Sequence, residues 1–184
     1  ATSIATHTAT VSAVNSAGWT CYCNSANEFL LGIKIGSTGA VIPTSGVQLK
    51  INSQSAVYYP FPTGFVGNPT GWIGLARTWN VTPSTQPSTS IPVRLMFTQK
   101  DIDSINVKLT QNSLTNISAP TDMSFYKVIN ASKPAHAVIS TLAQSDVNVY
   151  MNDVAPSLTK WKDSSLGGSK YLATLFVNSF SGGG

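Results

Sequence analysis

Charged side chains are scarce in this sequence, because only 10% of its 184 residues are Asp, Glu, Lys or Arg. An ordinary soluble protein has about 25%. The net charge of +4 comes from scattered lysines, without a run of basic residues. Nucleic-acid binding requires clustered basic side chains, so the composition argues against that function. The abundant Ser, Thr and Asn are typical of the neutral surfaces of extracellular β-proteins.

Long apolar runs and the residue pattern of a signal peptide are also missing from these 184 residues. No stretch approaches the roughly 18 apolar residues of a membrane-spanning helix. The first residues, ATSIATHTATVSAV, have neither the basic start nor the apolar centre of a signal peptide. If the protein is exported, we therefore expect this sequence to be a mature or trimmed form.

Motifs for catalysis are missing as well. The sequence contains no G-x-S-x-G nucleophile elbow, no H-E-x-x-H and no phosphate loop. Glu28 is the sole glutamate, and Asp101 and Asp103 would face different directions on a helix. We expect no enzymatic activity, although a carboxylate pair built from distant aspartates stays open.

Only two cysteines are present, Cys21 and Cys23, in the stretch GWTCYCN. On a strand they would share one face with Cα atoms roughly 6.5 to 7 Å apart, at the limit of what a disulfide spans. A zinc site would need two more ligands, and His7 and His136 lack a paired spacing. We interpret the cysteines as strand packing and expect no cofactor. A strained disulfide and a metal or redox site are the alternatives.

Turn signals recur along the chain, such as GSTG at 36–39 and PTSG at 43–46, between short segments rich in β-branched and aromatic residues. This pattern predicts an all-β, mostly antiparallel sandwich, Ig-like or jelly-roll-like. The expected strands cover residues 4–14, 19–24, 28–36, 47–52, 55–60, 72–81, 91–97, 122–130, 137–140, 147–151 and 170–180.

One segment has helical rather than strand periodicity. Thr98 can cap a helix, and Asp101, three residues later, can close a capping box. Apolar side chains then recur on one face at Ile102, Ile105 and Leu109. The sequence therefore predicts one short α-helix across an end of the sandwich.

The domain organisation follows from two low-complexity segments. The Pro- and Ser-rich stretch at 82–92 lies between strong apolar patterns, which favours a loop within one sandwich over a linker. The second segment is SFSGGG at 179–184, and its consecutive glycines lose much entropy on ordering. We expect one domain over 1–180 and the start of a flexible tail at 181–184.

Aromatic residues cluster in a segment punctuated by Pro and Gly. Exposed rings on a rigid loop can stack on sugars or contact proteins. Candidate ligand-binding residues are Tyr58, Tyr59, Phe61 and Trp72. The alternative is that Tyr58 and Phe61 belong to the core and the loop seals one end of the sandwich.

Several short motifs together resemble a segment near the C-terminal end of large Bacteroidota cell-surface proteins. The matching residues are Arg77, Trp79 and Val81, then Val93, Arg94, Phe97 and Thr98, then Phe125 to Val128, and finally Phe180 to Gly184. The resemblance implies export by type IX secretion, with a sorting domain beyond Gly184. It also implies an adhesin-like β-sandwich in which the cysteine positions are typically aromatic.

We therefore expect a non-catalytic structural or adhesive module on the bacterial cell surface. Its partners would be other surface proteins or copies of itself, without nucleic acid and without membrane insertion. Expected edge strands at 4–14 and 170–180 could pair with neighbours, because an unpaired edge is a template for strand addition. The alternative is a carbohydrate-binding module that uses the aromatic candidates.

Overall fold

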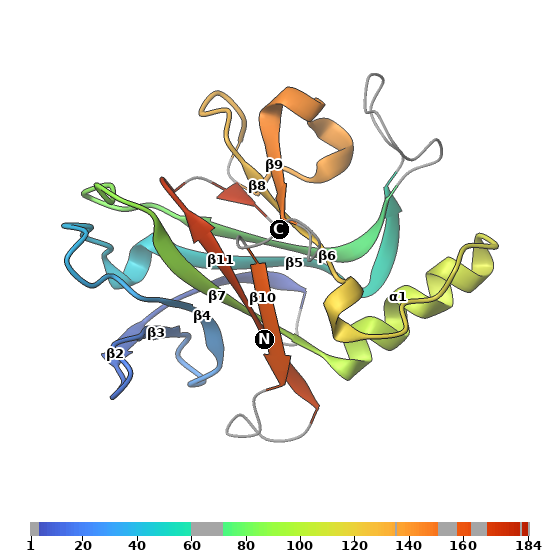
Figure 1. The fold of residues 1–184 in the computed structure, drawn as a ribbon, viewed down its shortest axis with the longest axis horizontal. Helices are drawn as coiled ribbons and strands as arrows, with labels where there is room; N and C mark the ends of the chain where they lie inside the picture. Colours follow the sequence, from blue (N-terminus) through green and yellow to red (C-terminus); the bar gives the residue numbers. More distant parts are fainter. Residues whose placement is uncertain are drawn as a thin grey trace.

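Two antiparallel β-sheets pack face to face, with one α-helix at their side in the part of the chain described (Figure 1). The computed structural model describes residues 4–59, 72–134, 136–150, 158–162, 169–180 and 182–183. Within these residues each sheet has six strands. This architecture confirms the predicted antiparallel β-sandwich with a short helix.

The first sheet, sheet A, has the strand order β1-β5-β6-β12-β8-β9. Strands β1, β5 and β6 form one side of this sheet and β8 and β9 form the other. Strand β12 lies between the two sides. Their bounds are β1 Ala5–Thr8, β5 Val47–Tyr59, β6 Trp72–Val81, β12 Gly182–Gly183, β8 Phe125–Val128 and β9 Val147–Tyr150.

The second sheet, sheet B, has the order β10-β11-β7-β4-β3-β2. Its bounds are β10 Leu158–Lys162, β11 Lys170–Val177, β7 Ile91–Thr98, β4 Phe29–Ile33, β3 Thr20–Cys23 and β2 Val11–Val14. Short 3₁₀ turns lie in the loops: η1 Thr44–Gly46, η2 Pro120–Asp122, η3 Ile139–Thr141 and η4 Gln144–Asp146.

Strand β7 shows why the two sheets adhere. Its residues alternate strictly between buried and half-buried, as the two-residue period of a strand requires. The buried side chains, Ile91, Val93, Leu95 and Phe97, face the core that both sheets share. From the other sheet, Trp79 on β6 donates from its indole Nε1 to the carbonyl of Leu30 at 2.9 Å. This bond satisfies the polar atom of a buried ring.

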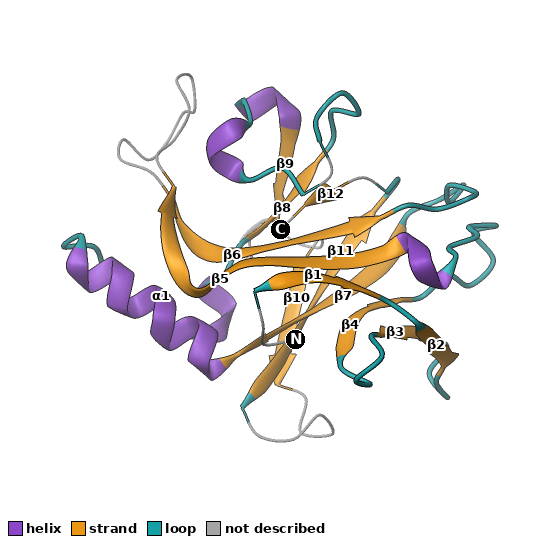
Figure 2. Ribbon diagram, turned by 180° about the vertical axis from the view of Figure 1, so that it is seen from behind, coloured by secondary structure: helices purple, strands orange, loops and turns teal. Residues whose placement is uncertain are grey.

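The helix α1, Gln99–Gln111, begins as the sequence predicts. Thr98 and Asp101 form the capping box. Ile102 and Ile105 are buried, and Leu109 packs against the same core. Figure 2 shows α1 lying along the ends of β5 and β6, which it contacts. The helix thereby covers one side of sheet A.

The segment 4–14, predicted as one strand, is two strands in different sheets. β1 pairs with β5 in sheet A, and β2 pairs with β3 in sheet B. The chain changes sheets at Ala9, whose backbone N–H bonds the carbonyl of Val47 at 2.9 Å and whose side chain is buried. Both strands are nevertheless edge strands, as expected.

Three further expectations need correction. The ranges 47–52 and 55–60 are one strand, β5, with a register shift between Ile51 and Ala56. Residues 137–140 do not form a strand, because Ile139–Thr141 make a 3₁₀ turn. The segment 170–180 is not an edge, because β10, a strand that the sequence did not predict, pairs with β11 on its outer side.

The last described residues also depart from the expected flexible tail. Gly182 and Gly183 form β12, which pairs with β6 on one side and with β8 on the other. Pairing with a strand on each side supplies backbone partners that compensate for the entropy that glycine loses on ordering. In the described part of the chain, β12 is the strand that joins β6 to β8 and so connects the two halves of sheet A.

Candidate functional site: a cleft between β6 and β8

Sheet A has a gap beyond β12. In the described part of the chain, β6 pairs with β12 only at Asn80 and Trp79, and β8 pairs with it only at Lys127. From Thr78 back to Trp72, that edge of β6 therefore faces no strand among the described residues. Among the described residues, no strand therefore lies between this part of β6 and the start of β8.

A cavity of about 420 Å³ occupies this gap. Ligand pockets usually measure roughly 300–1,000 Å³. One wall is β6, and the opposite wall is the segment from Asp122 to Tyr126. Apolar side chains dominate the lining, among them Leu75, Phe97, Ile105, Leu109, Phe125 and Ile139. A close-packed interior has few voids of this size, so the cavity is a distinct feature of the fold.

The cavity reaches both faces of the sheet. Alternate residues of a strand point to opposite faces, and neighbours such as Arg77 and Thr78 on β6 both line it. The same holds for Phe125 and Tyr126 on β8. The cavity is thus a cleft that crosses the plane of sheet A between β6 and β8.

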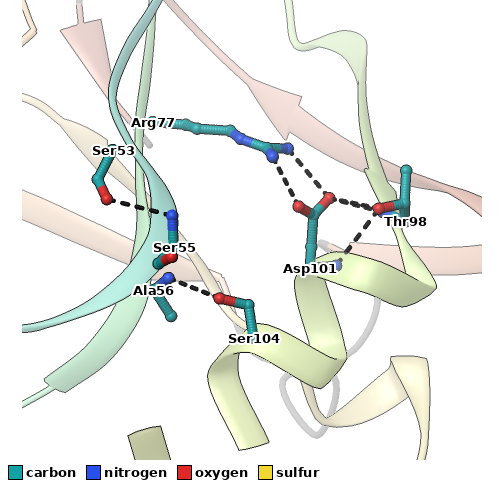
Figure 3. Close-up of polar contacts among 7 residues, drawn as sticks. All are labelled: Ser53, Ser55, Ala56, Arg77, Thr98, Asp101 and Ser104. Carbon is teal, nitrogen blue, oxygen red and sulfur yellow. Dashed lines mark hydrogen bonds and ion pairs between the residues drawn. The ribbon is translucent and has the colours of Figure 1, made fainter. Parts of the chain in front are cut away.

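An ion pair fixes the wall of the cleft on its core side (Figure 3). Arg77 donates from both terminal nitrogens to Asp101, at 2.6 and 3.0 Å, and the two side chains are only 15% and 6% exposed. Asp101 also accepts the backbone N–H of Thr98 at 2.8 Å. Because these contacts already occupy Asp101, we assign this pair a role in joining α1 to β6 rather than in catalysis.

Next to this pair, α1 also holds the irregular part of β5 (Figure 3). The hydroxyl of Ser104 accepts the backbone N–H of Ala56 at 2.7 Å, at the position where the register shifts. Nearby, the Ser53 hydroxyl accepts the N–H of Ser55 at 3.1 Å. These bonds satisfy donors that the disrupted ladder leaves without strand partners.

A second apolar cluster forms the outer side of the cleft. Val128, Ile139, Leu142 and two neighbours are buried there, and Tyr59 and Tyr126 pack against them. The Tyr126 hydroxyl donates to the carbonyl of Ala137 at 3.1 Å. Burial, with a smaller effect of Tyr59, raises the pKa of Tyr126, so its ring remains neutral at physiological pH.

The aromatic residues predicted to bind ligand are distributed as follows. Tyr58 is 37% exposed, whereas Tyr59 is half-buried in the wall of the cleft. As neighbours on β5 they point to opposite faces, so these two rings do not share a platform. Phe61 and the side chain of Trp72 lie outside the described residues. Carbohydrate binding by this set stays a prediction.

Cys21 and Cys23 are free thiols on one face of β3, and both are half-buried. Tyr22 between them points into the core and is 1% exposed. Cys21 faces Ala13 on one side and Gly32 on the other. This arrangement agrees with the interpretation of C-x-C as strand packing.

Thiol reactivity checks this arrangement. Burial raises the pKa of both Cys21 and Cys23, and the nearby Arg94 opposes this effect only at Cys21. Because the thiolate is the reactive form, we expect disulfide-exchange reagents at pH 8 to label the folded chain several-fold more slowly than the unfolded chain. Absence of any titratable thiol after unfolding without reductant would instead establish a disulfide.

Lys127 is a buried cation beside β12. It is 8% exposed, and its Nζ lies 3.5 Å from both the carbonyl of Val128 and the hydroxyl of Ser179. Neither partner is a carboxylate. Burial lowers the pKa of Lys127, because the charged form loses its hydration. The ammonium thus opposes folding at neutral pH.

Lys127→Met is expected to leave the free energy of unfolding unchanged or to raise it by about 1 kcal/mol at pH 7. With the folded-state pKa below the unfolded value, the wild type binds fewer protons when folded, so its stability rises with pH between the two values. The advantage of the variant should shrink over that interval. Urea unfolding of the wild type and the variant at pH 7 and at alkaline pH measures this difference in stability. Lys100→Met is the control, because Lys100 is exposed. A loss of 2 kcal/mol or more at pH 7 would contradict this account.

The described residues contain no group of three or more His, Cys, Asp and Glu side chains placed to hold a metal ion. His136 instead contacts Thr78, 2.9 Å from its Nδ1 to the Thr78 hydroxyl, on the outer face of sheet A. None of the helices in these residues is long and apolar enough to cross a membrane.

Comparison with known proteins gives no family for this chain. No family model matches it, and neither does any curated protein or solved structure.

Proposed function

We propose that this chain is a non-catalytic β-sandwich module that contacts other polypeptide by taking up an extended strand in the cleft of sheet A. The observation that carries the proposal is the edge of β6 beside the cavity, which pairs with no strand of the described residues between Thr78 and Trp72. A strand added to a sheet edge gains affinity from main-chain hydrogen bonds and selectivity from pockets for alternate side chains. As far as the described residues show, the cleft offers both an unpaired stretch of the β6 edge and apolar walls.

The proposed role is structural or adhesive, in an extracellular protein of a bacterial surface. The sequence supports this setting through its low charge and its many hydroxyl and amide side chains. Adhesive assembly also suits a fold in which β1 and β2 are edge strands of different sheets. The cleft differs from those edges because its apolar walls can enclose the added strand.

Peptide binding tests this function. A fluorescent ten-residue peptide of alternating Val and Thr, flanked by lysines, should bind saturably in an anisotropy titration, and a Gly-Ser peptide with the same flanks should not. Leu114 lines the cleft, so Leu114→Asp should abolish binding. Val107→Asp is the matched control, because Val107 is 55% exposed on α1 and does not line the cleft.

Two outcomes would overturn the proposal. The first is equal binding of both peptides, which would show that no strand is recognised. The second is that neither peptide binds, while a polysaccharide retards the chain in affinity electrophoresis. That result would favour carbohydrate binding as the function.

A further inference from the structure

We propose that two copies of this chain associate through the free edge of β2, which pairs antiparallel with itself about a two-fold axis at Ala13 and joins sheet B of both copies into one sheet. This inference goes beyond the cleft, because β2 lies at the edge of the other sheet and takes no part in the walls of the cleft. It follows from the exposure, the hydrogen bonds and the charge of β2.

Strand β2 is the most open edge among the strands whose burial is described. All of its residues are exposed, with Val11 at 49% and Val14 at 70%. The edge strands of sheet A are more covered, since β1 includes half-buried residues and β9 includes buried ones. Figures 1 and 2 both place β2 at the periphery of the molecule. No strand of the described residues pairs with β2 on the side away from β3, so a second chain can reach this edge.

The hydrogen bonds to β3 show which backbone groups of β2 point outward. At the end of this pairing, Asn15 donates its backbone N–H to the carbonyl of Trp19 at 2.9 Å. In an antiparallel pair, residues that exchange hydrogen bonds alternate with residues that do not. Counting back by twos from Asn15, the backbone of Ala13 also faces β3. The N–H and C=O groups of Ser12 and Val14 therefore point to the free edge, which presents a donor and an acceptor at both positions.

This spacing is complementary to itself. With Ala13 opposite Ala13 of the second copy, Ser12 of each copy lies opposite Val14 of the other, and each such pair can exchange both of its N–H···O bonds. A register centred on Ser12 would instead place Val14 opposite Thr10, whose N–H already bonds the carbonyl of Cys23 at 2.8 Å. The axis at Ala13 is thus the register that pairs every outward backbone group of β2.

The side chains of β2 also suit pairing with a second copy. Natural edge strands often avoid pairing by carrying charged residues. The strand VSAV has none, so pairing with itself brings no like charges together. At the axis, the two Ala13 residues would form a non-hydrogen-bonded pair, in which Cα atoms lie only about 4.5 Å apart. The small methyl side chain fits this close approach.

The free stretch is bounded at both ends, which favours an equally short partner strand. Beyond β2, the side chain of Asn15 accepts the backbone N–H groups of Ala17 and Trp19, both at 3.0 Å, and closes a turn. Before β2, the N–H of Thr10 is turned toward β3. A longer foreign strand would have unpaired backbone groups past these points, whereas a second copy ends its own free stretch at the same places. Because the shared edge is short, we expect a weak, concentration-dependent dimer.

Exchange of charges at the axis tests this pairing. Ala13→Lys and Ala13→Glu should each raise the dimer dissociation constant on the order of tenfold in sedimentation equilibrium, because like charges then face each other. An equimolar mixture of the two variants should dimerise about as tightly as the wild type, since Lys then faces Glu. Ala13 is exposed, so both variants should melt close to the wild-type temperature.

Val107→Lys and Val107→Glu are the matched control pair. Val107 is 55% exposed on α1 and lies on neither sheet. These two variants, alone or mixed, should leave the dissociation constant unchanged.

Other results would overturn the inference. A wild-type chain that stays monomeric at concentrations up to about 1 mM would show that β2 does not pair with itself. A dimer that Ala13→Lys leaves intact would have to associate through another surface. A dimer that both variants weaken and their mixture does not restore would contradict the register at Ala13. Peptide binding in the cleft is measured separately, so none of these results decides the proposed function.

Discussion

Asp101→Ala is expected to lower the free energy of unfolding by about 3–5 kcal/mol, because it leaves the guanidinium of Arg77 buried without its partner. The carboxylate accepts both terminal nitrogens of Arg77 and the backbone N–H of Thr98. The substitution therefore breaks the link between β6 and α1 and removes half of the capping box of the helix. Urea unfolding followed by circular dichroism measures the loss.

Asp103→Ala is the matched control on the same helix. Asp103 is exposed and bonds only Gln99 among the described contacts, at 3.0 Å. Its replacement should change stability by no more than about 0.5 kcal/mol. The double variant Arg77→Met/Asp101→Leu should recover much of the loss, since an apolar pair needs no charge compensation. A loss below 1 kcal/mol in Asp101→Ala would contradict the structural role of the pair.

Phe97→Ala is expected to be comparably severe, with a loss of about 3–5 kcal/mol. The ring is 1% exposed and lies 5.3 Å from the ring of Tyr171 and 6.0 Å from that of Phe125, between centroids. It thus joins sheet B to β8 of sheet A and also forms the floor of the cleft. Its removal takes away burial and ring contacts and enlarges an existing cavity.

Phe176→Ala separates this effect from the mere loss of an aromatic ring. Phe176 lies on β11 and is 44% exposed, so its replacement should cost no more than about 0.5 kcal/mol. Phe97→Leu, which keeps most of the apolar volume, should fall between the two. Thermal and urea unfolding of the three variants give the comparison. Similar losses for Phe97→Ala and Phe176→Ala would contradict the placement of Phe97 in the core.

The parts of the fold that depend on local sequence were predictable. The capping box at Thr98 and Asp101 and the apolar spacing of Ile102 and Ile105 are sufficient to place α1. Likewise, the strand predicted at 91–97 is β7, in which buried and half-buried residues alternate. Such patterns record which face of one element is buried, and that requires no knowledge of its neighbours.

The parts that depend on pairing between distant strands were not predictable. The change of sheet at Ala9 and the interior position of β11 follow from which strands lie side by side. The strand β12 has no side chains, so periodicity could not reveal it. Its place is set by β6 and β8, which lie far from it in the sequence.

The cleft was missed for the same reason. Leu75 and Phe125 lie in predicted strands, and nothing in either segment shows that a strand position between them is open. The sequence signal was the group of aromatic residues near Tyr59, which led to a carbohydrate hypothesis. Of that group, Tyr59 does line the cleft. The other described ring, Tyr58, belongs to the opposite face of β5.

Hydrogen exchange of the β6 amides in the 184-residue chain tests the account most directly. Alternate amides from Ile73 to Thr78 should exchange fast, because they face an edge without a strand, while the amides between them, which face β5, stay protected. Addition of the Val-Thr peptide should slow the fast set. Uniform slow exchange along β6 without peptide would show that the edge is already paired, and would contradict an open strand position.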